Sequence, residues 1–372
     1  MIDQNITYNY YDYIVVGAGL FGAAFAHTAN SLGKKVLIIE KENHIGGACY
    51  TEEKDGVIIH KCGPHIFHTS DKEIWDWVNQ FDNFKAFINQ PIAKHNNKIY
   101  NLPFNMNTFY QLYGALTPDE AAAAIKGDIA NIFGSSLEDY CYRTFGRKLY
   151  LTLIRDYTEK QWGRKCSQLP QSLIERVPLR FEYNNNYYND QYQGVPIHGY
   201  TKTIQEMLKG IPVMLNTSFK DLRTIYPDIW ADKIIYTGAI DEFYDYCFGK
   251  LEYRSLIWDE KIMNQGCAVV NYTDDSTPYT RSIEHRLFCG DTSLPAYCSF
   301  ERPVEWKKGL ERYYPISTPA NLALYQKYKD YVAEHDSNII FCGRIGGYKY
   351  INMDAAIIQA IKLAKEISKS NF

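Results

Sequence analysis

The sequence predicts an α/β fold in three parts: a parallel sheet flanked by helices, a helical insertion domain and an antiparallel β-sheet domain. A buried strand that runs into a glycine-rich turn and a helix predicts the first part. Apolar residues at helical spacing over about 71–175 predict the second, and short aromatic-rich runs after Pro178 predict the third. A chain of 372 residues also exceeds what one hydrophobic core usually supports, which agrees with several domains.

The turn after the first strand, residues 13–16, has the spacing G-x-G-x-x-G. Its glycines are Gly17, Gly19 and Gly22. Glycines at this spacing allow backbone N–H groups and a helix N-terminus to approach a pyrophosphate. A helical stretch over 23–32 and a second buried strand over 36–39 complete a β-α-β unit, which supports the motif. The start of the chain is therefore predicted to be a Rossmann-like dinucleotide-binding domain.

The residues after the second strand narrow the choice of dinucleotide. Glu40 ends that strand, where a carboxylate accepts hydrogen bonds from ribose hydroxyls and repels the 2′-phosphate of NADP. The glycine pair Gly46 and Gly47 resembles the extended signature of FAD enzymes of the glutathione-reductase and amine-oxidase type. We therefore predict FAD rather than NAD. The residues expected to bind it here are Gly17, Gly19, Leu20, Phe21, Gly22, Glu40, Lys41, Gly46, Gly47 and Ala48.

The central part contains several helix signals. A helical pattern begins at Asp71, and Thr117-Pro118-Asp119-Glu120 combines an N-cap hydroxyl, proline at the first helical position and glutamate at the third. Ser136 is expected to open another helix, and residues 149–154 continue a third. Residues 71–175 are therefore predicted to form a mainly helical substrate domain with a mobile loop.

The last part contains the strands of the antiparallel sheet and the end of the parallel one. The expected strands are 179–183, 213–215, 233–236, 251–258, 267–272, 279–288 and 297–302. A buried strand over 338–344 and a helix over 354–368 end the chain. We expect this strand to rejoin the parallel sheet and the segment 346–354 to place a helix N-terminus beside the flavin.

These patterns predict three discontinuous domains. The FAD-binding domain is expected to contain residues 1–70, about 195–240 and 315–372. The helical substrate domain is expected to contain residues 71–175. The antiparallel substrate domain is expected to contain residues 176–194 and about 241–314.

Composition and charge limit the possible partners. A formal net charge of −3 leaves no electrostatic footprint for nucleic acid or an anionic membrane. The nine cysteines are odd in number and contain no C-x-x-C pair, and no signal peptide or long apolar run is present. These observations predict a cytoplasmic protein with reduced thiols, no metal site, no nucleic-acid partner and no membrane insertion.

A series of motifs gives the sequence a family resemblance. The motifs are at 63–69, 101–106, 157–163 (Tyr-Thr-Glu-Lys-Gln-Trp-Gly), 176–181, 186–189, 192–196, 251–256, 279–281, 284–285, 313–315 and 343–344. In this order and spacing, from Tyr11 to near the C-terminus, the chain resembles the UDP-galactopyranose mutase family. This family is composed of flavin-dependent isomerases that interconvert UDP-galactopyranose and UDP-galactofuranose for cell-surface polysaccharide synthesis.

The resemblance implies a mechanism and its partners. FAD is active when reduced, and flavin N5 attacks the anomeric carbon of the sugar and displaces UDP before the ring recloses. The substrate is a nucleotide-diphosphate sugar, an external reductant such as NAD(P)H or a reductase supplies electrons, and a homodimer is possible.

The resemblance also implies which residues form the site. Arg176 and Arg281 match a pair of pyrophosphate-binding arginines, a task that suits the planar guanidinium fork. The other residues with implied catalytic roles are His65 at the flavin and Tyr314, Tyr350 and Glu301 around the sugar. Implied substrate contacts, besides the arginine pair and Tyr314, are Asn89, Phe104, Tyr157, Thr158, Trp162, Tyr187, Arg254, Asn271 and Asn352. Further implied flavin contacts are His65, Ile66, Gly343, Arg344, Tyr350, Asn352, Met353 and Asp354.

Four departures from the family pattern bear on the substrate. Ala48 replaces an asparagine, Cys62 replaces a tyrosine, Asn352 replaces an aspartate, and Arg302 stands where tyrosine is common. A different sugar, such as UDP-N-acetylgalactosamine or a dTDP-6-deoxyhexose like dTDP-fucose, is therefore an alternative substrate with the same chemistry. A flavin amine-oxidase-like oxidoreductase is a more distant alternative.

Overall fold

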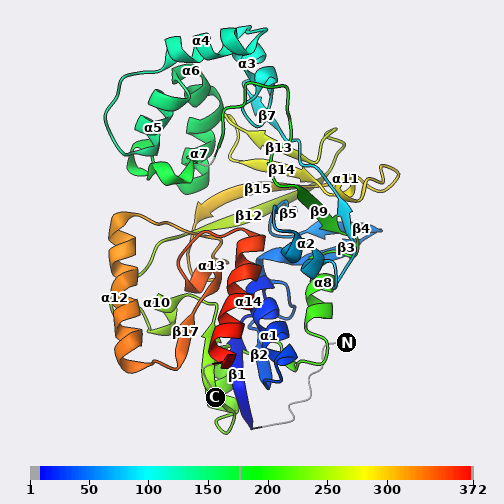
Figure 1. Ribbon diagram of the computed structural model, residues 1–372, viewed down its shortest axis with the longest axis vertical. Coiled ribbons are helices and arrows are strands. Elements are labelled where there is room, and N and C mark those ends of the chain that lie inside the picture. The colour runs from blue at the N-terminus through cyan, green and yellow to red at the C-terminus, as the bar shows by residue number, and fades with distance from the viewer. Residues whose placement is uncertain (1–8, 176, 370–372) are drawn as a thin grey trace.

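The computed structural model describes residues 9–175 and 177–369 (Figure 1). Arg176, one of the two expected pyrophosphate-binding arginines, lies outside the described residues. A five-stranded parallel sheet has the order β10-β2-β1-β11-β17. Its strands are β1 (Tyr10–Val16), β2 (Val36–Ile39), β10 (Val213–Met214), β11 (Trp230–Tyr236) and β17 (Ile339–Phe341). The prediction that the last strand rejoins this sheet is confirmed.

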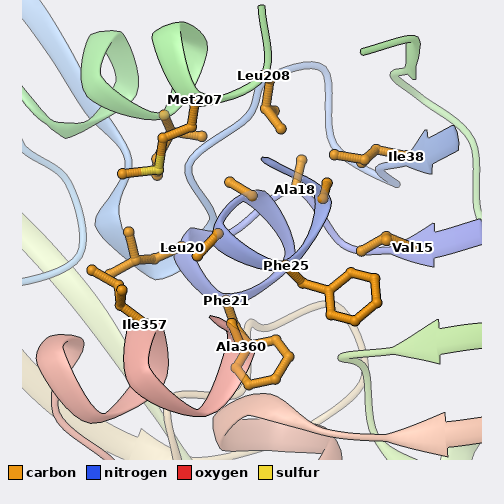
Figure 2. Packing of buried hydrophobic residues seen from close by; sticks show 14 of the residues in the cluster. Val15, Ala18, Leu20, Phe21, Phe25, Ile38, Met207, Leu208, Ile357 and Ala360 are labelled. Carbon is orange, nitrogen blue, oxygen red and sulfur yellow. The ribbon is translucent and has the colours of Figure 1, made fainter. Parts of the chain in front are cut away.

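The first helix, α1 (Leu20–Ser31), is buried against the sheet and two other helices. It packs beside α14 (Met353–Lys369) and α8 (Tyr200–Met207), which come from distant parts of the chain. Figure 2 shows Phe25 of α1 on the side of the sheet residue Val15, and Phe21 of α1 near Ala360 of α14. Small residues on α1 allow these close contacts, and the resulting core fixes the glycine turn at the start of the helix.

A second, seven-stranded sheet lies between the parallel sheet and a helical region (Figure 1). Its order is β16-β12-β15-β14-β13-β7-β8, and every pair is antiparallel except β13 with β7. The strands are β7 (Ile92–His95), β8 (Lys98–Asn101), β12 (Tyr253–Ile262), β13 (Val269–Tyr272), β14 (Arg281–Glu284), β15 (Tyr297–Glu305) and β16 (Tyr314–Pro315).

The helical region at the top of Figure 1 has its own hydrophobic core. Its helices are α3 (Met106–Tyr113), α4 (Pro118–Asp128), α5 (Leu137–Thr144), α6 (Arg147–Leu149), the π-helix η2 (Tyr150–Ile154), α7 (Arg155–Trp162), η3 (Cys166–Gln168) and η4 (Gln171–Leu173). Thr117 with Glu120, and Ser136 with Asp139, form capping boxes, which confirms the predicted starts of α4 and α5.

The remaining elements are short and connect the larger ones. Two small sheets contain β3 (Thr51–Lys54) with β4 (Val57–His60), and β5 (Phe67–Thr69), β9 (Tyr192–Pro196) and β6 (Phe84–Ala86) in the order β5-β9-β6. The other helices are η1 (Gly47–Cys49), α2 (Lys72–Val78), α9 (Phe219–Ile225), α10 (Ile240–Phe243), α11 (Arg286–Cys289), α12 (Pro319–His335) and α13 (Gly343–Gly346). Among the described helices, none combines the length and apolar character needed to cross a membrane.

Two strand predictions were wrong, and three short strands were not predicted. The interval 71–175 is mainly helical, as predicted, but β6, β7 and β8 also form within it. No strand forms over 179–183, and the strand expected over 279–288 ends at Glu284, where α11 soon follows. The missed strands are three or four residues long, and β6 and β7 pair with β9 and β13 far along the chain, so local patterns carry little information about them.

Candidate active site

The glycine turn after β1 combines two crowded positions with one open position. A Cβ on Gly17 would lie 2.1 Å from Thr237 Oγ1, and a Cβ on Gly22 would lie 2.1 Å from the Gly17 carbonyl oxygen. These two glycines therefore serve the tight turn and the packing of α1. A Cβ on Gly19 would make only ordinary contacts, 3.8 Å from the Gly47 Cα. The open position beside Gly19, at the N-terminus of α1, fits the approach of a pyrophosphate.

Glu40 connects the glycine turn to the second glycine pair. Its carboxylate accepts hydrogen bonds from the backbone N–H of Ala18 at 2.8 Å and of Glu42 at 3.0 Å. Burial raises the pKa of Glu40, and these two hydrogen bonds oppose that shift. The Gly46 N–H donates to the Ala18 carbonyl at 3.0 Å, so the two turns lie side by side. Each carboxylate oxygen keeps a lone pair for a ribose hydroxyl.

The end of the chain returns to the same place. Gly343 lies against Phe21, since a Cβ on Gly343 would be 3.6 Å from the Phe21 side chain. The Met353 sulfur lies 3.8 Å from Cys49 Sγ, which joins the start of α14 to η1. Helix α14 therefore begins beside the residues expected to hold the flavin, as the sequence predicts, and Figure 1 shows it alongside α1.

His65 is a half-buried histidine between β4 and β5, and its ring lies near those of His60 and Tyr200. Its Nδ1 is buried and has no hydrogen-bond partner among the described residues. Burial lowers the pKa of His65 to about 3, and the nearby His60, Arg344 and Arg281 lower it further. The imidazole is therefore neutral at physiological pH. Its unsatisfied ring nitrogen is suited to a polar group of a bound cofactor.

Three predicted site residues form one row across the seven-stranded sheet. Asn271 on β13 lies opposite Arg281 on β14, and Arg281 lies opposite Glu301 on β15. Directly opposed residues in adjacent strands project to the same face of a sheet. The register therefore brings together residues that are up to thirty positions apart in the sequence.

Arg281 and Glu301 form a buried ion pair in this row. Arg281 donates from Nε at 3.1 Å and from Nη2 to Glu301 Oε2, and Thr280 donates to Glu301 Oε1 at 2.6 Å. Burial disfavours the charge of Arg281, but the Glu301 carboxylate outweighs this effect and raises the pKa of Arg281 above its ordinary value. Both carboxylate oxygens are satisfied, while Arg281 Nη1 donates to no described side chain or backbone group.

Tyr157 and Tyr314 lie close enough to Arg281 to act on its pKa, and other aromatic residues flank Tyr314. The ring centres of Trp162 and Tyr314 are 6.1 Å apart, and those of Tyr314 and Tyr350 are 5.8 Å apart. The Arg344 guanidinium lies 4.8 Å from the ring centre of Tyr350. Burial and the Glu301 charge raise the pKa of Tyr314 to about 12, although Arg281 opposes the shift. Burial likewise raises the pKa of Tyr157. Both phenols therefore keep their protons and can donate hydrogen bonds.

Two more predicted contacts have buried side-chain oxygens without partners. Asn89 Oδ1 and Asn271 Oδ1 accept no hydrogen bond from any described residue. The Asn89 carbonyl accepts from the Tyr187 N–H at 2.8 Å, so these two expected substrate residues are adjacent. Buried amide groups that are unsatisfied by the protein are suited to a polar ligand.

Other predicted residues have structural contacts instead. Arg254 donates to the carbonyls of Gln161 at 2.9 Å and Lys160 at 3.0 Å, at the C-terminal end of α7. Phe104 lies in the helical core, 5.5 Å from Phe145 between ring centres. Lys41 forms an exposed ion pair with Glu311 at 2.6 Å. Their substrate or cofactor contacts stay predictions.

The other residues of the predicted sets lie on elements that border the same region. Ile66 and Thr158 are buried, Ala48 lies in η1, and Asn352 and Asp354 flank the start of α14. Sequence reasoning missed one residue inside its own motif: Lys160 of α7, whose ammonium contacts four backbone carbonyls. Contacts with backbone carbonyls cannot be recognised from residue types. The only signal in the sequence was that Lys160 lies within the motif 157–163.

Three observations of this structure show that the residues present fit a bound FAD. Gly19 leaves an open position at a helix N-terminus, Glu40 keeps acceptor capacity, and His65 has an unsatisfied buried nitrogen. The dinucleotide half of the site lies on the parallel sheet, and the Arg281 row lies on the second sheet above it.

Comparison with known proteins agrees with this arrangement. A family model described as UDP-galactopyranose mutase matches residues 152–350, and one described as an NAD(P)-binding Rossmann-like domain matches residues 15–81. The chain is 36% identical over 368 residues to a probable UDP-galactopyranose mutase of Klebsiella pneumoniae, covering 96% of this chain and 94% of the relative. It is 35% identical over 374 residues to a dTDP-fucopyranose mutase of Escherichia coli, covering 96% and 98%.

A solved structure supports the fold. A crystal structure of reduced UDP-galactopyranose mutase superimposes with a TM-score of 0.72 at 14% identity, over 97% of this chain and 96% of that one. At this identity the match shows a shared fold. The sequence relatives show more, because they span nearly the whole chain at more than one third identity. The protein is therefore an isomerase of the mutase type, and the chain belongs to the UDP-galactopyranose mutase family of flavin-dependent enzymes.

Proposed function

We propose that this protein interconverts the pyranose and furanose forms of a nucleotide-diphosphate sugar, with UDP-galactopyranose and UDP-galactofuranose as substrate and product. The observation that carries the proposal is the row Asn271, Arg281 and Glu301, which sets a buried cation among tyrosines next to the elements that fit FAD. A leaving diphosphate needs a fixed positive charge of this kind. FAD, when bound and reduced, supplies a nucleophilic nitrogen at the anomeric carbon and is regenerated at the end of the cycle.

The protein's own residues have separable roles in this proposal. Gly19 and Glu40 hold the pyrophosphate and a ribose of FAD, and His65 accepts or donates one hydrogen bond at the flavin as a neutral imidazole. Arg281 directs Nη1 to the diphosphate while Glu301 fixes its orientation. Tyr157 and Tyr314 are protonated and donate to phosphate or sugar oxygens.

The rest of the substrate site follows the family resemblance. Trp162 offers a ring face to the uracil, and Asn89 and Asn271 offer unsatisfied amide oxygens to polar groups of the nucleotide. Arg176 would add the second guanidinium. Tyr350 and Asn352 border the sugar. The reductant and a homodimer stay predictions.

A second candidate is the same chemistry on a dTDP-6-deoxyhexose. It is favoured by the near-equal similarity to the dTDP-fucopyranose mutase. Of the four departures from the family pattern, Arg302 supports a different substrate less strongly than the sequence alone suggested. Arg302 follows Glu301 on β15, so alternation places its side chain on the face opposite the Arg281 row. Arg302 is therefore less suited than Asn352 to act on a sugar bound beside the Arg281 row.

A substrate panel tests the proposal. The FAD-loaded protein is reduced with dithionite and incubated separately with UDP-galactopyranose, UDP-N-acetylgalactosamine and dTDP-fucopyranose, and products are separated by chromatography. We expect the furanose of UDP-galactose to form with the highest kcat/KM. A higher value for dTDP-fucopyranose would replace the proposed substrate with the second candidate. Absence of product from all three would overturn the proposal.

A further inference from the structure

Helix α7 and the turn between β13 and β14 are joined by one half-buried cation, the ammonium of Lys160. Lys160 Nζ donates to the backbone carbonyls of the turn residues Asp274 at 2.6 Å, Tyr279 at 2.8 Å, Tyr272 at 3.0 Å and Thr277 at 3.3 Å. An ammonium has three N–H bonds, so four acceptors saturate it and one N–H is shared. The turn therefore forms a ring of carbonyl oxygens closed around a cation from another element.

The ring of carbonyls depends on an ordered turn. The Asp274 carboxylate accepts hydrogen bonds from the Ser276 N–H at 2.9 Å and the Asn96 N–H at 2.7 Å. The Thr273 N–H donates to the Lys94 carbonyl at 2.9 Å, and the Tyr272 N–H donates to the Thr280 carbonyl at 2.9 Å. The turn is thus tied to β7 and to its own hairpin, and its carbonyls are held facing inward toward Lys160.

Both ends of this contact carry proposed substrate residues. On the helix, Tyr157 lies about one turn before Lys160, and Trp162 ends α7. On the sheet, Asn271 precedes the turn, and Arg281 begins β14 two residues after Tyr279. Arg254 makes the reciprocal contact, from the sheet to the α7 carbonyls. The distance between the aromatic residues and the Arg281 row therefore depends on the contact at Lys160.

We propose that Lys160 is a positioning residue for nucleotide binding: its ammonium, inside the carbonyl ring of the β13–β14 turn, fixes α7 against the strand that carries Arg281. The inference rests on the proposed function, because it assumes that the nucleotide lies between these two elements. Lys160 itself touches no reacting group. Its removal takes this donor from four carbonyls and weakens the attachment of α7 to the turn. Small shifts of positioning groups are costly in binding and rate.

The variant Lys160→Met keeps the length of the side chain and removes the charge. We expect it to weaken UDP binding to the FAD-loaded protein at least tenfold by calorimetry, with the FAD content per chain unchanged. The matched control is Lys148→Met, because Lys148 also donates to a backbone carbonyl, that of Leu112, within the helical region. The control should bind UDP within twofold of wild type.

A rescue experiment guards against a general folding defect. Lys160→Ala leaves space in the ring, and ethylammonium chloride should restore at least part of the UDP affinity, whereas sodium chloride at equal ionic strength should not. If ethylammonium has no greater effect than sodium, or if Lys160→Met binds UDP within twofold of wild type, the proposal is overturned.

Hydrogen exchange separates this proposal from the proposed function. In Lys160→Met, the amides of both α7 and residues 273–280 should exchange faster than in wild type, while those of α1 should not change. This result needs no substrate. Failure of wild-type protein to bind UDP would count against the proposed function, and unchanged exchange in both segments would overturn the role of Lys160.

Discussion

Arg281 shows how a single side chain is prepared for its role. Glu301 is fully buried and occupies Nε and Nη2 of the guanidinium, so the charge has a fixed direction before any ligand arrives. A preorganised cation needs no rearrangement during the reaction, which is the main electrostatic contribution to many rate enhancements.

Replacement of Arg281 should therefore be costly for rate. We expect Arg281→Ala to lower kcat/KM by more than about 10²-fold, because the developing diphosphate charge loses its partner and Glu301 is left unpaired. The kcat/KM of Arg281→Lys, which keeps the charge but loses the planar guanidinium fork, should lie between those of wild type and Arg281→Ala. The measurement is steady-state kinetics of the reduced, FAD-saturated protein. Arg223→Ala is the control, since Arg223 contacts the Ile229 carbonyl in a distant loop, and a wild-type rate for Arg281→Ala would contradict the assignment.

Lys160 predicts a pH dependence of nucleotide affinity. Burial lowers the pKa of Lys160 from 10.5 to about 8, and the facing carboxylates of Asp274, Asp156 and Asp275 oppose the shift. Below pH 8 the ammonium keeps all three donors, and above it one is lost. UDP affinity of wild type should therefore decline as the pH rises through 8, while that of Lys160→Met should stay flat. Parallel profiles for the two proteins would contradict this explanation.

Sequence reasoning identified the residue types of the site but not how they meet. Arg281, Glu301 and Asn271 were each predicted from motifs, and only strand register brings them into one row. Lys160 was overlooked as an anchor because its partners are backbone carbonyls more than a hundred residues away. Contacts of a side chain with a distant backbone depend on tertiary structure and leave no local pattern.

At the scale of elements, the unit β1–turn–α1 contains one glycine that the fold requires and another that the proposed cofactor requires. Gly22 is crowded by the protein itself, whereas Gly19 has a φ of −77° and space for a Cβ. The two glycines should therefore respond differently to the same substitution.

Gly19→Ala should fold normally and lose FAD, because the added methyl group occupies the space expected for the pyrophosphate. Gly22→Ala should lose about 2 kcal/mol or more of unfolding free energy, since its Cβ would overlap the Gly17 carbonyl. Urea unfolding and FAD content per chain measure the two effects. Full FAD content in Gly19→Ala would rule out this location of the pyrophosphate.

The same unit shows why some elements were predictable. Residues 13–16, 23–32 and 36–39 were expected as strand, helix and strand, and the structure has β1, α1 and β2 there within a few residues. Their signals are local: buried β-branched runs, glycines and helical periodicity. Strands β6 and β7 were missed because their partners lie more than a hundred residues away, and the run at 179–183 has strand composition without a partner strand.

At the scale of the whole molecule, three histidines from distant parts of the chain, His60, His65 and His285, form one cluster. The backbone N–H of His60 donates to His285 Nδ1 at 3.3 Å. The neutral His285 ring therefore carries its proton on Nε2, which donates to Ser299 Oγ at 2.7 Å. The His60 and His65 ring centres are 6.5 Å apart. Burial lowers the pKa of His60 to about 4 and lowers that of His285 as well. The three imidazoles are therefore neutral at physiological pH.

Neutral histidines in this cluster predict that the folded protein is less stable in acid. Below pH 6.5 the unfolded chain binds protons at these residues and the folded protein does not, so the free energy of unfolding falls as pH falls. His60 alone should account for about 3 kcal/mol between pH 7 and pH 4, from the shift of its pKa from 6.5 to about 4. His60→Phe should flatten this part of the profile in urea unfolding, whereas His335→Phe, at an exposed position, should not. Equal slopes for wild type and His60→Phe would contradict the explanation.

The arrangement of the three regions explains why the proposed site lies where it does. The parallel sheet offers a dinucleotide turn, the second sheet offers a fixed cation, and the helical region brings Tyr157 and Trp162 toward both (Figure 1). The domain boundaries drawn from the sequence stay a prediction. Each of the three regions nevertheless contributes residues to the proposed site.

In the proposed function, reduced flavin takes part in ring contraction without net oxidation or reduction. The most direct measurement reduces the FAD-loaded protein once with a limiting amount of dithionite, adds UDP-galactopyranose under anaerobic conditions and counts furanose product per reducing equivalent. We predict many turnovers per equivalent, with the flavin spectrum still reduced at the end. One molecule of product or fewer per reducing equivalent would contradict this role of the flavin and indicate an oxidoreductase. Product formation only with a continuous supply of reductant or oxidant would do the same.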